Sequence, residues 1–344
     1  MGSVGTAIAY ACLIRGSAAS LALYDIFAKK VRAEVLDLTH GSQFVPHCPV
    51  DGGDDLAVTA DSQIVVVTAG AKQKPGQTRL ELAATNVAMA QELTPKLLEL
   101  SPGAVIVFVT NPVDVITYAA VKSVDLPPGR IFGSGTVLDS SRFRYLIAEL
   151  ADLAVANVHG FIVGEHGDSE ISLWSSVSIG GVPAERFQAD GKLLFDKETQ
   201  SKISHDVVHA AYEIIEGKGA TNLAIGLSTA RIIEAIRGHQ HRVLPVSTLQ
   251  TGVYGIEDVC LSLPTVVTAR APARCWKSRW PTPNWPDCGR PHRRCTTRGH
   301  PSTEGQERLK PFEQAEFREH RRVQERHDVR DVRGSDVQHV QLKR

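Results

Sequence analysis

Three polar side chains in two short motifs have the types and spacing for acid–base chemistry on an anionic ligand. His166 lies in GEHGDSE (164–170), and an imidazole can exchange a proton near neutral pH. Arg142 follows Asp139 by three residues in DSSRFR (139–144), so both would project from roughly the same side of a helix. The planar guanidinium suits a bidentate grip on a carboxylate, and Asp139 would orient His166 and stabilise its protonated form. The alternatives are a structural histidine in a glycine-rich turn and an ordinary i,i+3 surface pair.

The first residues of the chain match the second half of a GxGxxG phosphate loop. In Gly2-Ser3-Val4-Gly5 the glycines would let the backbone turn tightly and approach a pyrophosphate at the N-terminus of the next helix. Asp25 ends the apolar run LALYD about 20 residues further on, at the spacing of the ribose-binding acid. A carboxylate there accepts hydrogen bonds from the ribose hydroxyls and repels a 2′-phosphate. We therefore expect Gly2, Val4, Gly5 and Asp25 to bind NAD; a capping glycine and a surface aspartate are the alternative.

These residues must be positioned by an alternation of strands and helices. Short β-branched runs at 21–25, 64–70 and 105–111 are typical of parallel strands buried on both faces. Helical patterns at 28–41 and 82–100 separate them, which predicts an α/β fold with a Rossmann-like doubly wound parallel sheet. Longer helices at 141–153 and 203–219 and a hairpin around 179–183 predict a second, α+β domain.

Composition excludes several other classes of protein. The 344 residues are 42% hydrophobic and 22% charged, as in ordinary globular proteins, and suffice for two domains. Apolar runs are too short to span a bilayer and no secretory leader is visible, so we expect no membrane partner. Six cysteines without paired spacing suit a reducing compartment, which predicts a cytoplasmic protein.

The last 77 residues differ in composition from the rest of the chain. Residues 268–344 contain 18 Lys and Arg against 10 Asp and Glu, whereas residues 1–267 contain 20 against 28. This segment shows no helical or strand period, and we expect an aberrant Pro/Arg-rich tail that is not folded. Its Cys and His spacing matches no standard zinc site, so we expect no metal. Interleaved acids also argue against a nucleic-acid-binding tail.

Motifs in residues 1–267 together resemble the lactate/malate dehydrogenase family, and within it the bacterial, allosterically regulated L-lactate dehydrogenases. The resemblance implies a dinucleotide-binding domain over 1–133, a substrate domain over 134–267, and reversible hydride transfer between NADH and pyruvate. It assigns His166 as proton donor, Asp139 as its partner and Arg142 as substrate anchor. The motifs, in the order and spacing of the family, are EVLDLTHG (34–41), TAGAKQKPGQTRLEL (68–82), TNPVDV (110–115), GSGTVLDSSRFR (133–144) and GEHGDSE (164–170).

The resemblance also identifies a loop that closes over substrate, AKQKPGQTR (71–79). Arg79 would arrive with closure and polarise the reacting carbonyl. Gln73 lies where related malate dehydrogenases carry Arg, and its uncharged amide would leave a second substrate carboxylate unpaired. Gln73 and Thr221, in KGATN, therefore imply pyruvate rather than oxaloacetate.

Two smaller residues and two activator residues complete the implied site. Asn111 would lie near the nicotinamide and the catalytic histidine, and Ser134 would help to hold the carboxamide. Arg144 and His159 match the positions at which bacterial relatives bind fructose 1,6-bisphosphate between subunits. This match implies an activated homotetramer, whereas an exposed arginine and a structural histidine are the alternative.

Both ends of the chain depart from the family pattern. Relatives begin with a strand that ends in the first glycine of GxGxxG, whereas Met1 stands at the middle position of GxG. We expect a first domain that lacks its first strand, explained by a late-assigned start codon, and a shift of reading frame near Val267. The rival functional hypotheses are a damaged, catalytically silent product that only binds nucleotide or oligomerises, and a malate dehydrogenase.

Overall fold

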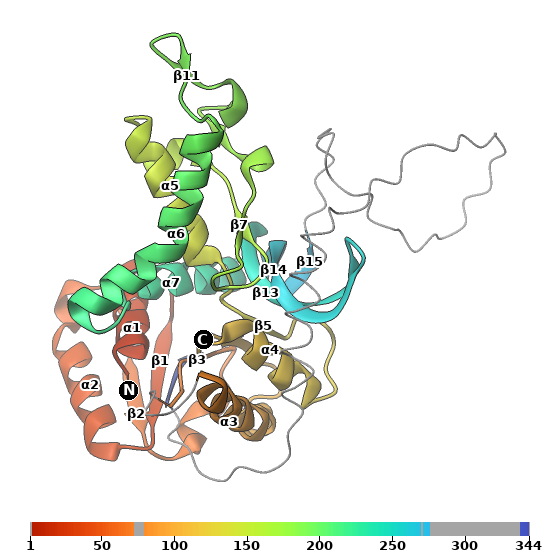
Figure 1. Ribbon diagram of the computed structural model, residues 1–344. Coiled ribbons are helices and arrows are strands. Elements are labelled where there is room, and N and C mark those ends of the chain that lie inside the picture. The colour runs from red at the N-terminus through yellow and green to blue at the C-terminus, as the bar shows by residue number, and fades with distance from the viewer. Residues whose placement is uncertain (1, 72–78, 270, 276–337, 344) are drawn as a thin grey trace, which may run out of the picture.

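The computed structural model describes residues 2–71, 79–269, 271–275 and 338–343. Two domains follow each other along the chain (Figure 1). The first contains helices α1–α4 and most of a large sheet, and the second rises above it with helices α5 and α6 and a group of short hairpins. Helix α7 lies between the two.

A nine-stranded sheet forms the core of the molecule, in the order β15-β14-β13-β5-β4-β3-β16-β1-β2. The pairs β1–β2, β3–β4 and β4–β5 are parallel. In chain order the strands are β1 (Ser20–Asp25), β2 (Val50–Gly53), β3 (Ile64–Val67), β4 (Val105–Phe108), β5 (Ile131–Gly133), β13 (Arg242–Val253), β14 (Ile256–Thr268), β15 (Ala271–Cys275) and β16 (Gln338–Lys343).

Helices cover both faces of this sheet. Helices α1 (Ser3–Arg15), α2 (Ala28–His40) and α7 (Leu223–Arg237) contribute to one buried apolar cluster, and α3 (Arg79–Leu100) and α4 (Val113–Lys122) to another. Strands β3 and β4 supply alternate residues to both clusters, and every side chain in them is buried. Continuous β-branched runs form such strands because both faces are apolar. The α/β fold with a Rossmann-like doubly wound sheet is confirmed: strands β1–β5 all run in the same direction, and β13–β16 add antiparallel pairs.

Strand β16 fills the slot between β1 and β3. It runs antiparallel to both neighbours, and Val340 pairs in register with Leu23 on one side and Val66 on the other. This slot is where the family's first strand was expected to be missing. Strands β15 and β16 both belong to the segment in which the sequence showed no strand period. These two strands form by pairing with neighbouring strands, and a local sequence pattern does not indicate such pairing.

The second domain has its own core. Helices α5 (Val137–Leu150) and α6 (Lys197–Lys218) pack around buried aromatic and aliphatic residues that include Phe143, Phe195 and Ile203. The predicted hairpin near 179–183 is present as β9 (Ser178–Ile179) and β10 (Val182–Pro183), joined by two glycines with positive φ. The remaining short strands are β6 (Val158–His159), β7 (Ile162–Val163), β8 (Ile171–Ser172), β11 (Gln188–Ala189) and β12 (Lys192–Leu193).

None of the helices in the described part of the chain is long and apolar enough to cross a membrane.

Candidate active site

The first two turns of helix α5 position a carboxylate and a guanidinium next to each other. Asp139 lies in the first turn, where the partial positive charge of the helix N-terminus favours an anion. Its side chain is only 3% exposed, and that of Arg142, one turn later, is 14% exposed. Arg142 Nη1 donates to Asp139 Oδ1 at 2.6 Å. The two side chains thus share one face of the helix, as the i,i+3 spacing requires.

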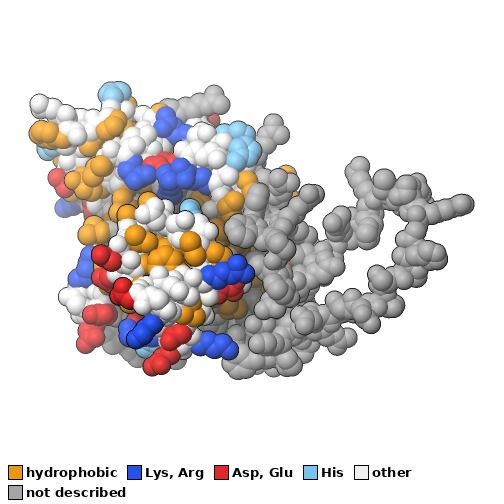
Figure 2. Space-filling model, turned by 90° about the horizontal axis from the view of Figure 1, so that it is seen from above, with side chains coloured by type: hydrophobic (Ala, Val, Ile, Leu, Met, Phe, Trp, Pro, Cys, Tyr) orange, Lys and Arg blue, Asp and Glu red, His pale blue; other side chains and the backbone are white. Residues whose placement is uncertain are grey.

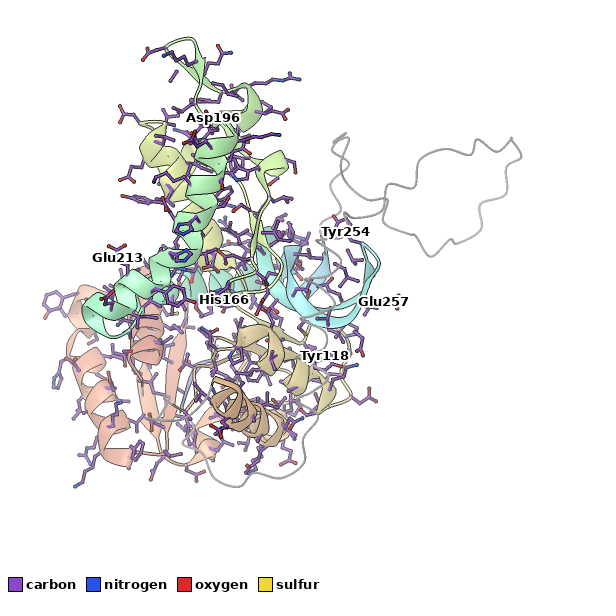
Figure 3. The ribbon with its side chains drawn as sticks, in the orientation of Figure 1. Tyr118, His166, Asp196, Glu213, Tyr254 and Glu257 are labelled. Carbon is purple, nitrogen blue, oxygen red and sulfur yellow. The ribbon has the colours of Figure 1, made fainter. Side chains whose placement is uncertain are left out.

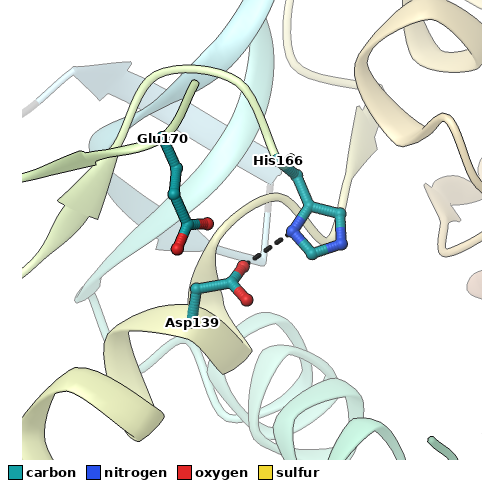
Figure 4. A group of neighbouring side chains, drawn as sticks. All are labelled: Asp139, His166 and Glu170. Atoms are coloured by element: carbon teal, nitrogen blue, oxygen red, sulfur yellow. Dashed lines mark hydrogen bonds and ion pairs between the residues drawn. The ribbon is translucent and has the colours of Figure 1, made fainter. Parts of the chain in front are cut away.

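His166 reaches the same carboxylate from a loop of the second domain. The loop leaves strand β7 at Gly164, which has a φ of +93° and pairs with Ser262 through both backbone groups. His166 Nδ1 then lies 2.7 Å from Asp139 Oδ2 (Figure 4). Because a carboxylate only accepts hydrogen bonds, Nδ1 carries a proton in this pair. The other ring nitrogen points away from Asp139 and is the one available to a ligand.

A buried carboxylate on helix α4 holds the backbone of the histidine. The His166 amide donates to Asp114 Oδ2 at 2.8 Å, and the Ser247 hydroxyl donates to the other oxygen of Asp114. Asp114 therefore fixes the loop relative to α4, at the junction of the two domains where Figure 3 places His166. Sequence reasoning missed Asp114. The available signal was an acidic residue three positions after Asn111, inside an otherwise apolar helix start.

The charges around His166 favour its protonated form. Burial alone would lower the pKa of His166, but the Asp139 carboxylate, and beyond it Asp114, raise the pKa to about 9. Burial likewise would raise the pKa of Asp139, yet His166 and Arg142 hold it below its ordinary value. At neutral pH the site therefore combines an imidazolium, a carboxylate and a guanidinium.

The N-terminus of helix α1 and the end of strand β1 offer the groups a dinucleotide needs. Gly2 caps α1 without a side-chain hydrogen bond, and the first turn contains no acidic residue. The helix therefore presents backbone N–H groups and a positive end to a phosphate, and Val4 and Gly5 lie in that first turn. Only four residues join α1 to β1, so Asp25 lies at the same end; its buried carboxylate accepts a hydrogen bond from the Phe27 amide. These groups fit NAD.

The structure shows the following positions for the remaining predicted ligand residues. Asn111 is exposed, and its carbonyl accepts a hydrogen bond from the Asn86 amide. Ser134 is half-buried directly after β5, and its N–H donates to Phe108 O at 2.7 Å. Thr221 lies in the link between α6 and α7, where no hydrogen bond recorded among the described residues joins it to His166. Arg79 is the first residue of α3.

The last two predicted residues lie in the stretch that leads into α3 and at its first position. Gln73 lies outside the described residues, and of Arg79 only the backbone is described. Neither side chain enters the geometry given above.

The two predicted activator residues line one groove of about 950 Å³ between α5, α7 and the start of β13. Arg144 donates from Nε to Gly160 O at 2.8 Å and stacks on the Phe161 ring, and burial lowers the pKa of its guanidinium. His159 is exposed at the rim. The same groove is lined by three further arginines, Arg15, Arg231 and Arg242.

Charge is otherwise mixed over the outer face of the second domain. Figure 2 looks down on that face and shows cationic, anionic and hydrophobic side chains interspersed, with no single kind covering it.

Both domains match models of a known family. "Lactate/malate dehydrogenase, NAD binding domain" matches residues 1–133, and "lactate/malate dehydrogenase, alpha/beta C-terminal domain" matches residues 136–276. Among similar proteins, an L-lactate dehydrogenase of Bifidobacterium animalis subsp. lactis is 49% identical over 267 residues, which are 77% of this chain and 83% of the relative. One from Synechococcus sp. is 47% identical over 77% of this chain and 85% of its own. L-lactate dehydrogenase B of Hordeum vulgare is 47% identical over 76% and 77%.

Proposed function

Because the chain belongs to the lactate/malate dehydrogenase family, we propose that its site interconverts pyruvate and L-lactate with NAD(H). The observation that carries the proposal is a single carboxylate, Asp139, that holds His166 through one oxygen and Arg142 through the other. A proton donor and a carboxylate anchor are thereby fixed side by side, which is the arrangement that a small 2-keto acid requires.

NADH, held by the N-terminus of α1 and Asp25, would supply the hydride that reduces the carbonyl carbon. Arg142 directs its guanidinium toward the substrate carboxylate while one of its N–H groups stays on Asp139. His166, with Nδ1 held by Asp139, gives the proton on its other nitrogen to the carbonyl oxygen. The carboxylate of Asp139 stabilises the imidazolium before transfer, and the rigid pair limits the geometries in which transfer takes place.

The choice of pyruvate over oxaloacetate depends on sequence and on the relatives. Gln73 carries no charge to balance a second carboxylate, and the relatives that cover most of this chain are L-lactate dehydrogenases. Thr221 supports the same assignment. A higher kcat/KM for oxaloacetate than for pyruvate, measured with NADH on the full chain, would instead make the protein a malate dehydrogenase.

We further propose that fructose 1,6-bisphosphate activates a homotetramer in the cytoplasm. Arg144 and His159 lie in one groove with three more arginines, and clustered cations suit a diphosphate. The three buried free thiols among the described residues fit a reducing compartment. Sedimentation and pyruvate kinetics with and without the sugar diphosphate test this proposal, and an unchanged KM and oligomeric state would count against it.

The decisive test of the chemistry is the replacement His166→Asn. Asn cannot supply the proton, so kcat for pyruvate reduction should fall by about 100-fold or more. NADH affinity, measured by fluorescence, should be unchanged, because the replacement leaves the N-terminus of α1 and Asp25 as they are. If the unaltered full chain binds NADH but does not oxidise it with pyruvate, the rival hypothesis holds, and the protein is a catalytically silent product that only binds nucleotide.

A further inference from the structure

A second carboxyl group lies against the Asp139–His166 pair. Glu170 ends the His166 loop just before strand β8, and its N–H donates to Gly167 O at 3.3 Å. Its side chain turns inward toward Asp139 (Figure 4). Polar atoms of Glu170, Asp139 and His166 all lie within 4.8 Å of one another.

The neighbouring cations are already engaged by the other carboxylate. Asp139 uses one oxygen for Arg142 and the other for His166. Glu170 Oε1, in contrast, is buried and has no hydrogen-bond partner within the described residues. A buried carboxylate without a partner is costly, and a second negative charge beside Asp139 adds repulsion.

The groups facing Glu170 set the balance of charge. Helix α5 contributes Asp139 and Arg142, the loop itself contributes His166 and Asp168, and Asp114 of α4 lies behind the loop. Against three carboxylates there are two cations, and both of these contact Asp139 directly. A proton on Glu170 avoids a fourth negative charge beside these groups without disturbing the Asp139–His166 pair.

We propose that Glu170 is a positioning residue that carries a proton at neutral pH, so that the substrate anion meets one carboxylate in this pocket instead of two. Loss of that proton places a negative charge beside the imidazolium and repels a 2-keto acid. Burial, and then the charge of Asp139, raise the pKa of Glu170 to about 8. This shift favours the protonated form, as does the buried oxygen of Glu170 that lacks a partner in the described part of the chain. Glu170 thereby limits substrate binding at alkaline pH.

The protonation state can be tested without turnover. A protonated carboxylic acid has a C=O stretch that is absent from a carboxylate, and difference infrared spectra of the full chain between pH 7 and pH 9 should show it disappearing. The band should be missing in Glu170→Gln. It should persist in Glu165→Gln, a matched change in the same loop at a carboxylate that accepts a hydrogen bond from Ser169. An identical spectrum in Glu170→Gln would overturn the proposal.

The kinetic consequence rests on the proposed function. If pyruvate binds only the protonated form, a group with a pKa of about 8 raises KM about tenfold between pH 7 and pH 9. The ratio of KM at these two pH values should therefore be five- to tenfold smaller in Glu170→Gln than in the unaltered chain or Glu165→Gln. Equal ratios in all three proteins would overturn the effect on binding. Absence of turnover in all three would reject the proposed function, and the infrared band would still decide the state of Glu170.

Discussion

Each carboxylate oxygen of Asp139 contacts a different cation, and these two contacts determine the chemistry of the site. Through Oδ2 it keeps His166 charged and fixes the ring, and through Oδ1 it holds Arg142 one helical turn away. Its 3% exposure means that water competes little for either contact.

Replacing Asp139 by Asn should therefore move the alkaline limit of pyruvate reduction to lower pH. Without the carboxylate, burial lowers the pKa of His166 from about 9, so the imidazole loses its proton at a lower pH. A pH profile of kcat for pyruvate reduction between pH 5 and about 10 measures the shift, because the effect proposed for Glu170 acts on KM. Asp190→Asn, at an exposed hairpin tip, should leave the profile unchanged. An unshifted limit in Asp139→Asn would show that the carboxylate does not control the imidazole.

Sequence predicted the site only where its residues follow one another along a regular element. The Asp139–Arg142 pair could be read from i,i+3 spacing on a helix, and the family resemblance added His166. Asp114 and Glu170 were missed because their roles depend on contacts across the fold, Asp114 with a backbone 52 positions away and Glu170 with a carboxylate on α5. No local pattern encodes either contact.

At the scale of elements, the packing of α1 on α7 depends on a glycine. A Cβ at Gly226 would meet Ala7 O at 2.6 Å and Ala7 C at 2.8 Å, and both of these are backbone atoms that cannot turn aside. The two helices are also joined by Arg15 and Glu234, whose carboxylate accepts from Nε and Nη2 of the guanidinium. Because the proposed phosphate-binding site lies at the N-terminus of α1, we expect the packing of α1 on α7 to affect cofactor binding.

Replacing Gly226 by Ala should lower the free energy of unfolding by about 1–3 kcal/mol, because the added methyl group forces the helices apart. Gly217 provides a matched control inside α6, since a Cβ there has nothing within 4 Å. Gly217→Ala should raise the free energy of unfolding by about 0.5–1 kcal/mol through helix propensity alone. Urea unfolding of both variants measures the difference, and equal effects would argue against close packing at Gly226.

Strands and helices with a clear period were predictable from the sequence, although their ends were not. The runs at 64–70 and 105–111 contain β3 (Ile64–Val67) and β4 (Val105–Phe108). The pattern at 203–219 overlaps α6, which begins earlier at Lys197 and ends at Lys218. That earlier start is capped by Asp196, whose side chain accepts from the Thr199 amide. The long β13–β14 hairpin was missed because its two strands are defined mainly by each other.

At the scale of the whole molecule, the large sheet depends on a strand from the far end of the chain. Strand β16 pairs with β1 over six positions and with β3 over four, and α1 lies against it. Without it, β1 and β2 would be separated from the rest of the sheet. The sequence could not predict this arrangement, because residues 268–344 show no strand periodicity that would indicate pairing with β1 or β3.

Replacing Gln341 by Pro should destabilise the protein. Gln341 pairs with Ala22 on one side and Val65 on the other, and proline removes the N–H that this part of the ladder requires. The expected loss is about 1–3 kcal/mol, the cost of a buried backbone group without its partner. Gln341→Thr keeps the N–H and should be nearly neutral. Urea unfolding followed by circular dichroism measures both, and equal midpoints would show that β16 contributes nothing to stability.

The position of β16 also bears on when this protein can fold during its synthesis. A ribosome releases β1 and β3 long before residue 343, so their shared neighbour is the last element of the sheet to emerge. Until then two strand edges stay open, the kind of surface on which nascent chains associate wrongly with one another. The nucleotide-binding half can therefore be completed only after residues 338–343 have emerged, and chaperones that shield open edges should matter more here than for a chain whose sheet closes in order.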